Sequence, residues 1–192
     1  MPESPLDIDT RFRLLKALAA LVSIGLLIGN LHIYSPGLAS AASIAEVSNT
    51  LSDSSPGTVA NHTIIFTTPT GINNGETVTI DFSDGPFTGT SSITASDIDV
   101  QSGETDLSVA SSCGGADQIG ASFSGATLTL TFCSGNGAAI AANGSTTIEI
   151  GDHASFGGSG SNQLVNPVTT GSYDIIIDGT QADDGTAVVV II

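Results

Sequence analysis

Short segments of alternating apolar and polar residues, separated by turn residues, run through most of this chain of 192 residues. In ETVTIDF (76–82), Val78, Ile80 and Phe82 fall on one face of an extended chain, and threonine and aspartate fill the other. A period of two predicts half-buried β-strands. The segments that we expect to be strands are 62–69, 76–82, 91–100, 105–112, 119–124, 127–132, 146–151, 173–179 and 186–192.

Repeated short strands with regular turn signals are typical of an all-β sandwich or barrel. We predict a single Ig-like or Greek-key β-sandwich of about eight to nine strands over residues 58–192, preceded by an N-terminal signal helix. The polar, turn-rich segment 42–57 is expected to be a flexible lead. Asn74-Gly75 predicts a hairpin turn because both residues tolerate positive φ. The segment 135–144 is open between a loop and one helical turn.

The N-terminal 41 residues have the pattern of a secretory signal peptide. All three basic residues of the chain lie in RFRLLK (11–16), and an uninterrupted apolar run covers residues 17–29. Ala39 and Ala41 then form an A-x-A cleavage signal. We predict cleavage after Ala41, with Ala42 or Ala45 as neighbouring options. An uncleaved anchor over 14–34 and a pilin-type leader cut before the apolar run are the alternatives.

No Lys or Arg follows Lys16, so the rest of the chain carries only acidic charges. Of the 19 Asp and Glu residues, three precede residue 42, and the remaining 16 account for the whole net charge of −16. Such a chain offers no cation to neutralise a phosphate, which argues against binding to nucleic acid or to anionic lipid. Negative self-repulsion also disfavours the compact state, and salt, a divalent ion or a basic partner would relieve it.

The two cysteines, Cys113 and Cys133, flank the expected hairpin of 119–124 and 127–132, so the hairpin brings them together. An exported chain with an even number of cysteines usually oxidises them. We predict a structural disulfide. A redox pair or thiolate metal site is the alternative, but there is no C-x-x-C spacing and no nearby histidine in the sequence.

Catalytic patterns are sparse, and we expect no catalytic residue. Only His62 and His153 follow residue 41, whereas nucleophilic hydrolysis needs a serine or cysteine beside a positioned histidine. GGSGS (157–161) is close to a nucleophile elbow but lacks the final glycine and a strand-turn-helix context. We interpret both histidines as core or surface residues.

Acidic residues in loops provide the one candidate cofactor, Ca²⁺. Asp178, Asp183 and Asp184 form the best group of oxygen ligands, although no EF-hand spacing is present. The competing interpretation is that Asp forms turns and keeps the protein soluble. We expect no other cofactor.

The C-terminal segment TAVVVII is apolar and rich in β-branched residues; it comprises Thr186, Ala187, Val188, Val189, Val190, Ile191 and Ile192. One interpretation is a last core strand paired with 173–179. The other is an assembly strand, because such a segment can complete the sheet of a neighbouring molecule by strand addition.

The stretch VSNTLSDSSPGTVANHTIIFTTPTGI (47–72), followed by GETVTIDF, resembles the start of Thr-rich β-sandwich surface proteins of candidate-phyla-radiation bacteria, and more distantly bacterial Ig-like surface modules. The resemblance covers about the first third of the chain after the signal segment. It implies a secreted or cell-surface protein and transfers no functional residue.

Together these features predict an exported, non-catalytic structural component of the cell surface or of an extracellular matrix or filament. The expected partner is a second copy of the chain, joined by strand addition. The alternative is an adhesin-like binding module for a glycan or a protein, with or without Ca²⁺.

Overall fold

The computed structural model describes residues 7, 9, 10, 12, 13, 15–19, 42–154 and 160–192. The chain divides into two units, 1–39 and 40–192. In the first unit, residues 15–19 are helical, and Phe12, Leu15 and Leu18 are exposed. No helix in the described part of the chain is both long and apolar enough to cross a membrane. The predicted cleavage residues Ala39 and Ala41 lie outside the described residues.

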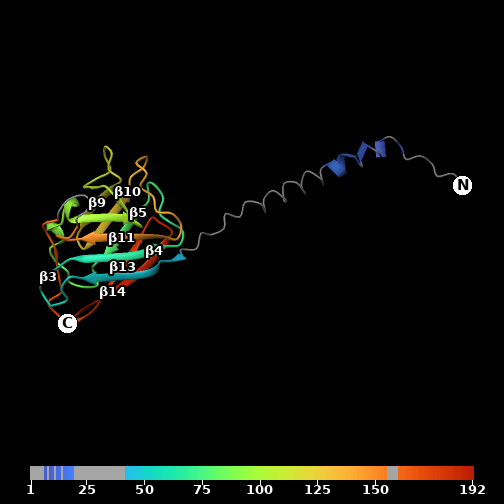
Figure 1. Cartoon of the computed structure of the whole chain (residues 1–192). Coiled ribbons are helices and arrows are strands. Elements are labelled where there is room, and N and C mark those ends of the chain that lie inside the picture. The colour runs from blue at the N-terminus through green and yellow to red at the C-terminus, as the bar shows by residue number, and fades with distance from the viewer. Residues whose placement is uncertain (1–6, 8, 11, 14, 20–41, 155–159) are drawn as a thin grey trace. The chain divides into compact units, whose positions relative to one another are not determined.

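The second unit consists of two large sheets and one small one (Figure 1). The seven-stranded sheet has the order β1-β14-β13-β5-β10-β9-β8, the five-stranded sheet has the order β2-β4-β11-β6-β7, and β12 pairs with β3. The strands are β1 (Ala42–Ser43), β2 (Ala45–Leu51), β3 (Val59–Ala60), β4 (His62–Thr68), β5 (Thr77–Asp81), β6 (Ile98–Ser102), β7 (Thr105–Leu107), β8 (Val109–Ala110), β9 (Ile119–Ser124), β10 (Thr127–Phe132), β11 (Gly144–Ile150), β12 (Leu164–Val165), β13 (Gly171–Gly179) and β14 (Asp183–Ile191). Two 3₁₀ turns, η1 (Thr90–Ser92) and η2 (Ala95–Asp97), precede β6.

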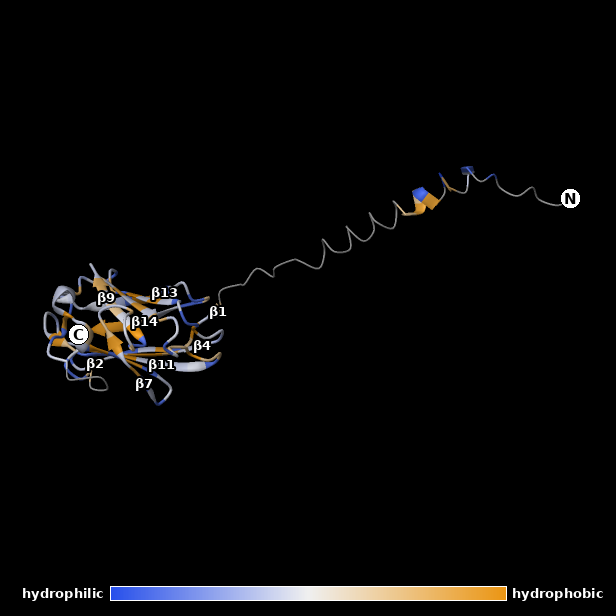
Figure 2. Cartoon of the chain, turned by 90° about the horizontal axis from the view of Figure 1, so that it is seen from above, coloured by the Kyte–Doolittle hydropathy of each residue, from blue (hydrophilic) through white to orange (hydrophobic). Residues whose placement is uncertain are grey.

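This arrangement confirms the predicted all-β sandwich. Burial alternates along the long strands, so that Phe66 and Ile148 of the five-stranded sheet and Ile80, Leu130 and Val189 of the seven-stranded sheet are almost fully buried in one core. Figure 2 shows hydrophobic residues along the strands and hydrophilic ones mainly in the loops. Threonines occupy many of the outward positions, because a β-branched polar side chain suits a pleated, solvated surface.

Two local predictions were wrong. Residues 42–57 are not a lead that precedes the domain, because β1 and β2 lie within them and Ile44 is buried in the core. The turn at Asn74-Gly75 exists, with φ of +90° at Gly75, but it is not a hairpin turn. It connects β4 and β5, which belong to different sheets. A local turn signal gives the chain reversal but cannot tell which sheet the next strand joins.

The prediction of one strand over residues 91–100 was also wrong, because within this segment only the residues from Ile98 onward form a strand, β6. Thr94 and Asp97 explain the difference: the Thr94 hydroxyl and backbone N–H both donate to the Asp97 carboxylate, at 2.7 and 2.8 Å. This capping arrangement stabilises a 3₁₀ turn in place of a strand. The segment 135–144 forms a loop with no helix.

Between β1 and β2 the chain passes from the seven-stranded sheet to the five-stranded sheet. Ala42 and Ser43 pair in parallel with Asp183 and Asp184 of β14, and the next strand, β2, pairs with β4 of the other sheet. Ile44 is the point of exchange, and its buried side chain packs against Gly185, where an added Cβ would lie 3.0 Å from the Cβ of Ile44. Beyond this exchange no described strand is hydrogen-bonded to the outer edge of β14, although β2 of the other sheet runs close beside it.

Candidate assembly edge at the C-terminal strand

Strand β14 contains most of the predicted assembly strand and lies near the edge of the seven-stranded sheet. It pairs antiparallel with β13, from Gly171 opposite Ile191 to Ile177 opposite Gly185. The interpretation of 186–192 as a core strand paired with 173–179 is therefore confirmed. Its side chains divide by face: Ala187, Val189 and Ile191 are buried, whereas Thr186, Val188, Val190 and Ile192 are exposed.

The outer edge of β14 is closed at both ends and open between them. At one end the Ile44 N–H donates to the Asp184 carbonyl at 2.8 Å, and at the other the Ile192 N–H donates to the Ser54 carbonyl at 3.0 Å. The main-chain groups of alternate residues point to the same side of a strand. Those of Thr186, Val188 and Val190 must therefore face the open edge, and no strand among the described residues pairs with them.

The remaining sheet edges are short or irregular. At the far side of the seven-stranded sheet, β8 has two residues. In the five-stranded sheet, β7 has three residues, and β2 has an irregular register between Ala45 and Ser48, with φ of +53° at Glu46. Short length and bulges are the means by which proteins protect edges from unwanted pairing. Strand β14 has nine residues and contains neither lysine nor proline, and no register shift interrupts its pairing with β13.

An apolar outer strip lies along this edge. It consists of Val188, Val190 and Ile192 of the C-terminal segment and Ile176 of β13, with exposed fractions of 55%, 51%, 75% and 45%. Ile176 pairs with Thr186 and is thus diagonal to Val188 on the same face. The C-terminal residues of the strip could be predicted from the sequence, but Ile176 could not, because three consecutive isoleucines in β13 do not indicate which side chain points outward.

Exposed carboxylates lie around the outer strip. Asp174 is opposite Val188 in the β13–β14 pair. Asp178 and Asp184 lie where β13 ends and β14 begins. The segment from Gly185 to Ile192 has no ionisable side chain. The open edge is therefore an uncharged stretch within a strongly acidic surface.

The predicted calcium ligands do not converge. Asp183 is buried, and its carboxylate accepts hydrogen bonds from the N–H and the hydroxyl of Thr70, both at 2.9 Å. Asp178 accepts a hydrogen bond from the N–H of Gly179, and Asp184 is exposed. In the described ranges no group of three or more His, Cys, Asp and Glu side chains could hold a metal ion. The arrangement gives the calcium prediction no support.

Main-chain donors stabilise several of these carboxylates in place of cations. Asp97 is fully buried and accepts hydrogen bonds from the N–H groups of Ser161 and Asn162, at 2.6 and 2.9 Å, as well as from the Asn162 amide and from Thr94. Burial by itself would raise the pKa of Asp97, but these hydrogen bonds outweigh it and hold the pKa well below its usual range. The Asp97 carboxylate thereby fixes the start of the segment 160–163.

Carboxylates gather on the outer face of the five-stranded sheet. Glu149 of β11 lies directly opposite Asp99 of β6 on one side and Thr63 of β4 on the other. Burial raises the pKa of Glu149, His153 opposes the rise, and the charge of Asp99 adds to it. One carboxylate oxygen of Glu149 is buried without a hydrogen-bond partner among the described residues. This site costs stability when Glu149 is charged.

Among the described residues, neither histidine of the sandwich has the partners of a catalytic base. His62 is fully buried against Phe82 and Phe87, with ring centroids 5.4 and 5.6 Å away, and burial lowers its pKa to about 3. The Nε2 of His153 lies 2.9 Å from the Thr63 hydroxyl. Its Nδ1 has no acceptor in the part of the chain that the structure describes, so the bond that orients the base in a catalytic triad is missing there.

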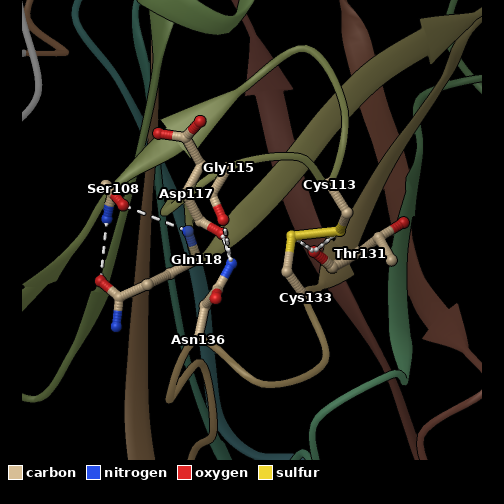
Figure 3. Close-up of a disulfide and its surroundings, with 8 residues drawn as sticks. All are labelled: Ser108, Cys113, Gly115, Asp117, Gln118, Thr131, Cys133 and Asn136. Atoms are coloured by element: carbon tan, nitrogen blue, oxygen red, sulfur yellow. Dashed lines mark hydrogen bonds between the residues drawn. A yellow bond between two sulfur atoms is a disulfide. The ribbon is translucent and has the colours of Figure 1, made fainter.

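The predicted disulfide is present between Cys113 and Cys133, whose Cα atoms are 5.4 Å apart (Figure 3). The Thr131 carbonyl oxygen lies 3.7 and 3.6 Å from the two sulfurs. Because disulfide sulfurs carry no hydrogen, these are contacts and not hydrogen bonds. The Asn136 amide also ties the loop after Cys133 to the carbonyls of Gly115 and Asp117. This end of the sandwich is thus a cross-linked structural element.

Comparisons with known proteins add no relative: no family model matches the chain, and neither a curated protein nor a solved structure matches it. The resemblance of residues 47–72 to Thr-rich surface proteins stays a prediction.

Proposed function

We propose that this protein is an exported, non-catalytic structural component of a cell surface or an extracellular matrix, and that it assembles by strand addition at β14. The observation that carries the proposal is the open edge, where the main-chain groups of Thr186, Val188 and Val190 face outward beside an apolar outer strip. A strand added there would satisfy these groups and cover the exposed valines.

Two features support export. The basic and apolar N-terminal segment has the signal-peptide pattern. The Cys113–Cys133 disulfide is typical of proteins that fold in an oxidising compartment. The acidic body also favours an extracellular role over binding to nucleic acid, since no lysine or arginine follows Lys16.

Deleting residues 186–192 would not test this proposal, because Ala187, Val189 and Ile191 belong to the core. Val188→Pro is a sharper variant. Its lost N–H faces the open edge and not β13, and proline is tolerated in a strand at such positions. The purified full chain with Val188→Pro should keep the fold, as measured by far-UV circular dichroism, and should lose self-association in light scattering.

Val189→Pro is the matched control. The N–H of Val189 faces β13, so proline there should disrupt the sheet and lower the melting temperature strongly. If Val188→Pro folded normally and associated as the wild type does, β14 would not be the assembly edge.

A further inference from the structure

We propose that a small pocket beside the disulfide binds one ring of a neutral sugar, as a free molecule or as the end of a glycan. The pocket has a volume of about 220 Å³ and is called the hydroxyl pocket below; it is lined by Ser111, Ser112, Cys113, Gly120, Ser122 and Thr131. None of these residues belongs to the β14 edge, so the hydroxyl pocket is independent of strand addition.

The floor of the hydroxyl pocket is the outer face of the seven-stranded sheet. Thr131 of β10 lies opposite Gly120 of β9, and Ser122 is two residues further along β9, on the same face as Gly120. The neighbours Ala121 and Leu130 point to the other face and are buried in the core. Two hydroxyl groups are thereby held on a regular, hydrogen-bonded strand pair.

One wall of the hydroxyl pocket is the segment 111–113, which follows β8 and passes over Gly120. A Cβ added at Gly120 would lie 2.8 Å from the backbone nitrogen of Cys113 and 3.1 Å from the carbonyl carbon of Ser112. The absence of a side chain at Gly120 therefore allows the wall to approach the sheet this closely.

The disulfide holds this wall in place. It joins Cys113 to Cys133, which directly follows β10, and Figure 3 shows Thr131 of the pocket floor beside it. A wall that is already fixed by a covalent bond loses little conformational freedom when a ligand binds, which favours binding by a small number of contacts.

Four hydroxyl groups line the pocket, and the fold uses none of them. Among the described residues no side-chain hydroxyl of this set takes part in a hydrogen bond, and the sulfur contacts of Thr131 involve its carbonyl oxygen alone. A hydroxyl group both donates and accepts hydrogen bonds. Such a set matches a ligand whose own polar groups are hydroxyls. The set is Ser111, Ser112, Ser122 and Thr131.

Charge and polarity exclude the other classes of ligand. None of the described residues that line the pocket is ionisable, since Cys113 is held in the disulfide. The net charge of −16 repels anions, and hard cations prefer the carboxylates elsewhere on the surface to neutral hydroxyls. An apolar ligand would bury the hydroxyls without partners. A neutral ligand with several hydroxyl groups fits all of these conditions.

The size of the pocket limits the ligand to one ring. Drug-sized ligands occupy clefts of about 300–1,000 Å³, and the hydroxyl pocket, at about 220 Å³, is smaller. Ser111, Ser112 and Ser122 are exposed, so the pocket opens onto the surface. The remaining units of a glycan can therefore continue into the solvent.

NMR titration of the isotope-labelled full chain tests the pocket. The probes are methyl glycosides of neutral hexoses and of N-acetylhexosamines, with the corresponding uronic acids as anionic counterparts. At least one neutral glycoside should shift the amide signals of Gly120, Ser122 and Thr131 in a saturable manner, and its uronic acid should shift them much less. The proposal is overturned if no neutral glycoside shifts these signals, or if the uronic acid binds as well.

Removal of single hydroxyls tests the contacts. Ser122→Ala and Thr131→Val should each weaken binding about fivefold, because each removes one hydrogen bond. Ser124→Ala and Thr127→Val are the matched controls: they lie on the same two strands, outside the lining, and should bind as the wild type does. Far-UV circular dichroism checks that all four variants are folded. Equal affinities in the four variants would show that the bound sugar lies elsewhere.

An oligosaccharide that ends in the bound sugar identifies the source of the ligand. If it binds at least as tightly as the methyl glycoside, the ligand is a glycan end; if it binds more weakly, the ligand is the free sugar. Both results support the hydroxyl pocket. Failure of every sugar to bind would leave strand addition untouched, because that proposal depends on the self-association of Val188→Pro.

Discussion

The Asp97 carboxylate accepts the backbone N–H groups of Ser161 and Asn162, residues more than 60 positions away, at 2.6 and 2.9 Å. A buried anion without a cation costs several kcal/mol unless hydrogen bonds replace its hydration. Here the main chain supplies them, which shows how a chain with no Lys or Arg after residue 16 can bury a charge.

Asp97→Ala should therefore destabilise the protein by about 3 kcal/mol, because it leaves these donors unpaired. Because the folded pKa of Asp97 is depressed, its contribution is present above the unfolded pKa of about 4 and is lost as the pH falls toward the folded value. Urea unfolding at pH 7 measures the loss. Asp184→Ala, at an exposed position, is the control and should change stability little; equal losses in both variants would contradict this role.

His62 should make the protein sensitive to moderate acid. The unfolded chain protonates its histidines near pH 6.5, whereas burial lowers the pKa of His62 in the folded state to about 3. Between these values the unfolded state binds one proton more, so the free energy of unfolding falls by about 1.4 kcal/mol for each pH unit as the pH decreases. In His62→Phe the free energy of unfolding should lose this contribution of His62 to its pH dependence. Urea unfolding between about pH 6 and pH 4.5 measures it, because this range lies between the unfolded and the folded pKa of His62. Identical slopes in the two proteins would show that His62 is not buried in the neutral form.

Glu149 should have the opposite effect. Burial and the neighbouring Asp99 raise its pKa, so the charged form destabilises the folded state at neutral pH, and protonation relieves the cost as the pH falls through the raised pKa. Glu149→Gln should stabilise the protein by on the order of 0.5 kcal/mol at pH 7 and by less at pH 4. The exposed Glu104→Gln is the control. A destabilised Glu149→Gln at pH 7 would mean that an unseen partner stabilises the carboxylate.

The disulfide should stabilise the sandwich without affecting assembly. It closes a loop with a sequence separation of 20, and chain entropy gives about 3 kcal/mol for a loop of this size. The double variant Cys113→Ser, Cys133→Ser should melt roughly 10 °C lower, yet it should still self-associate at temperatures where it is folded. Loss of self-association in a folded double variant would place the assembly contact near the disulfide and away from β14.

Much of this architecture could be predicted because outward and inward residues alternate along β5, β10 and β14. The disulfide could be predicted because the hairpin of β9 and β10 brings Cys113 close to Cys133. Sheet membership could not be predicted. Nothing local distinguishes a turn at Asn74-Gly75 within one sheet from a turn between sheets. Strand β2 looks like a polar lead because none of its seven residues is fully buried and only alternate ones are partly covered.

Only part of the candidate site could be predicted from the sequence. The β-branched residues Val188 to Ile192 were apparent from the sequence, but Ile44 and Ser54, which close the ends of the edge, act only through main-chain groups. Main-chain hydrogen bonds leave no residue-specific signal. The length of the open edge could therefore be determined only from the structure.

The most direct measurement is the mass of the purified wild-type chain by sedimentation equilibrium over a range of concentrations, in about 0.5 M salt so that repulsion between the acidic bodies is screened. Strand addition at the open edge predicts a reversible rise above the mass of one chain as the concentration increases, with Val188→Pro remaining at the single-chain mass throughout. A single-chain mass for the wild type at every concentration would contradict it.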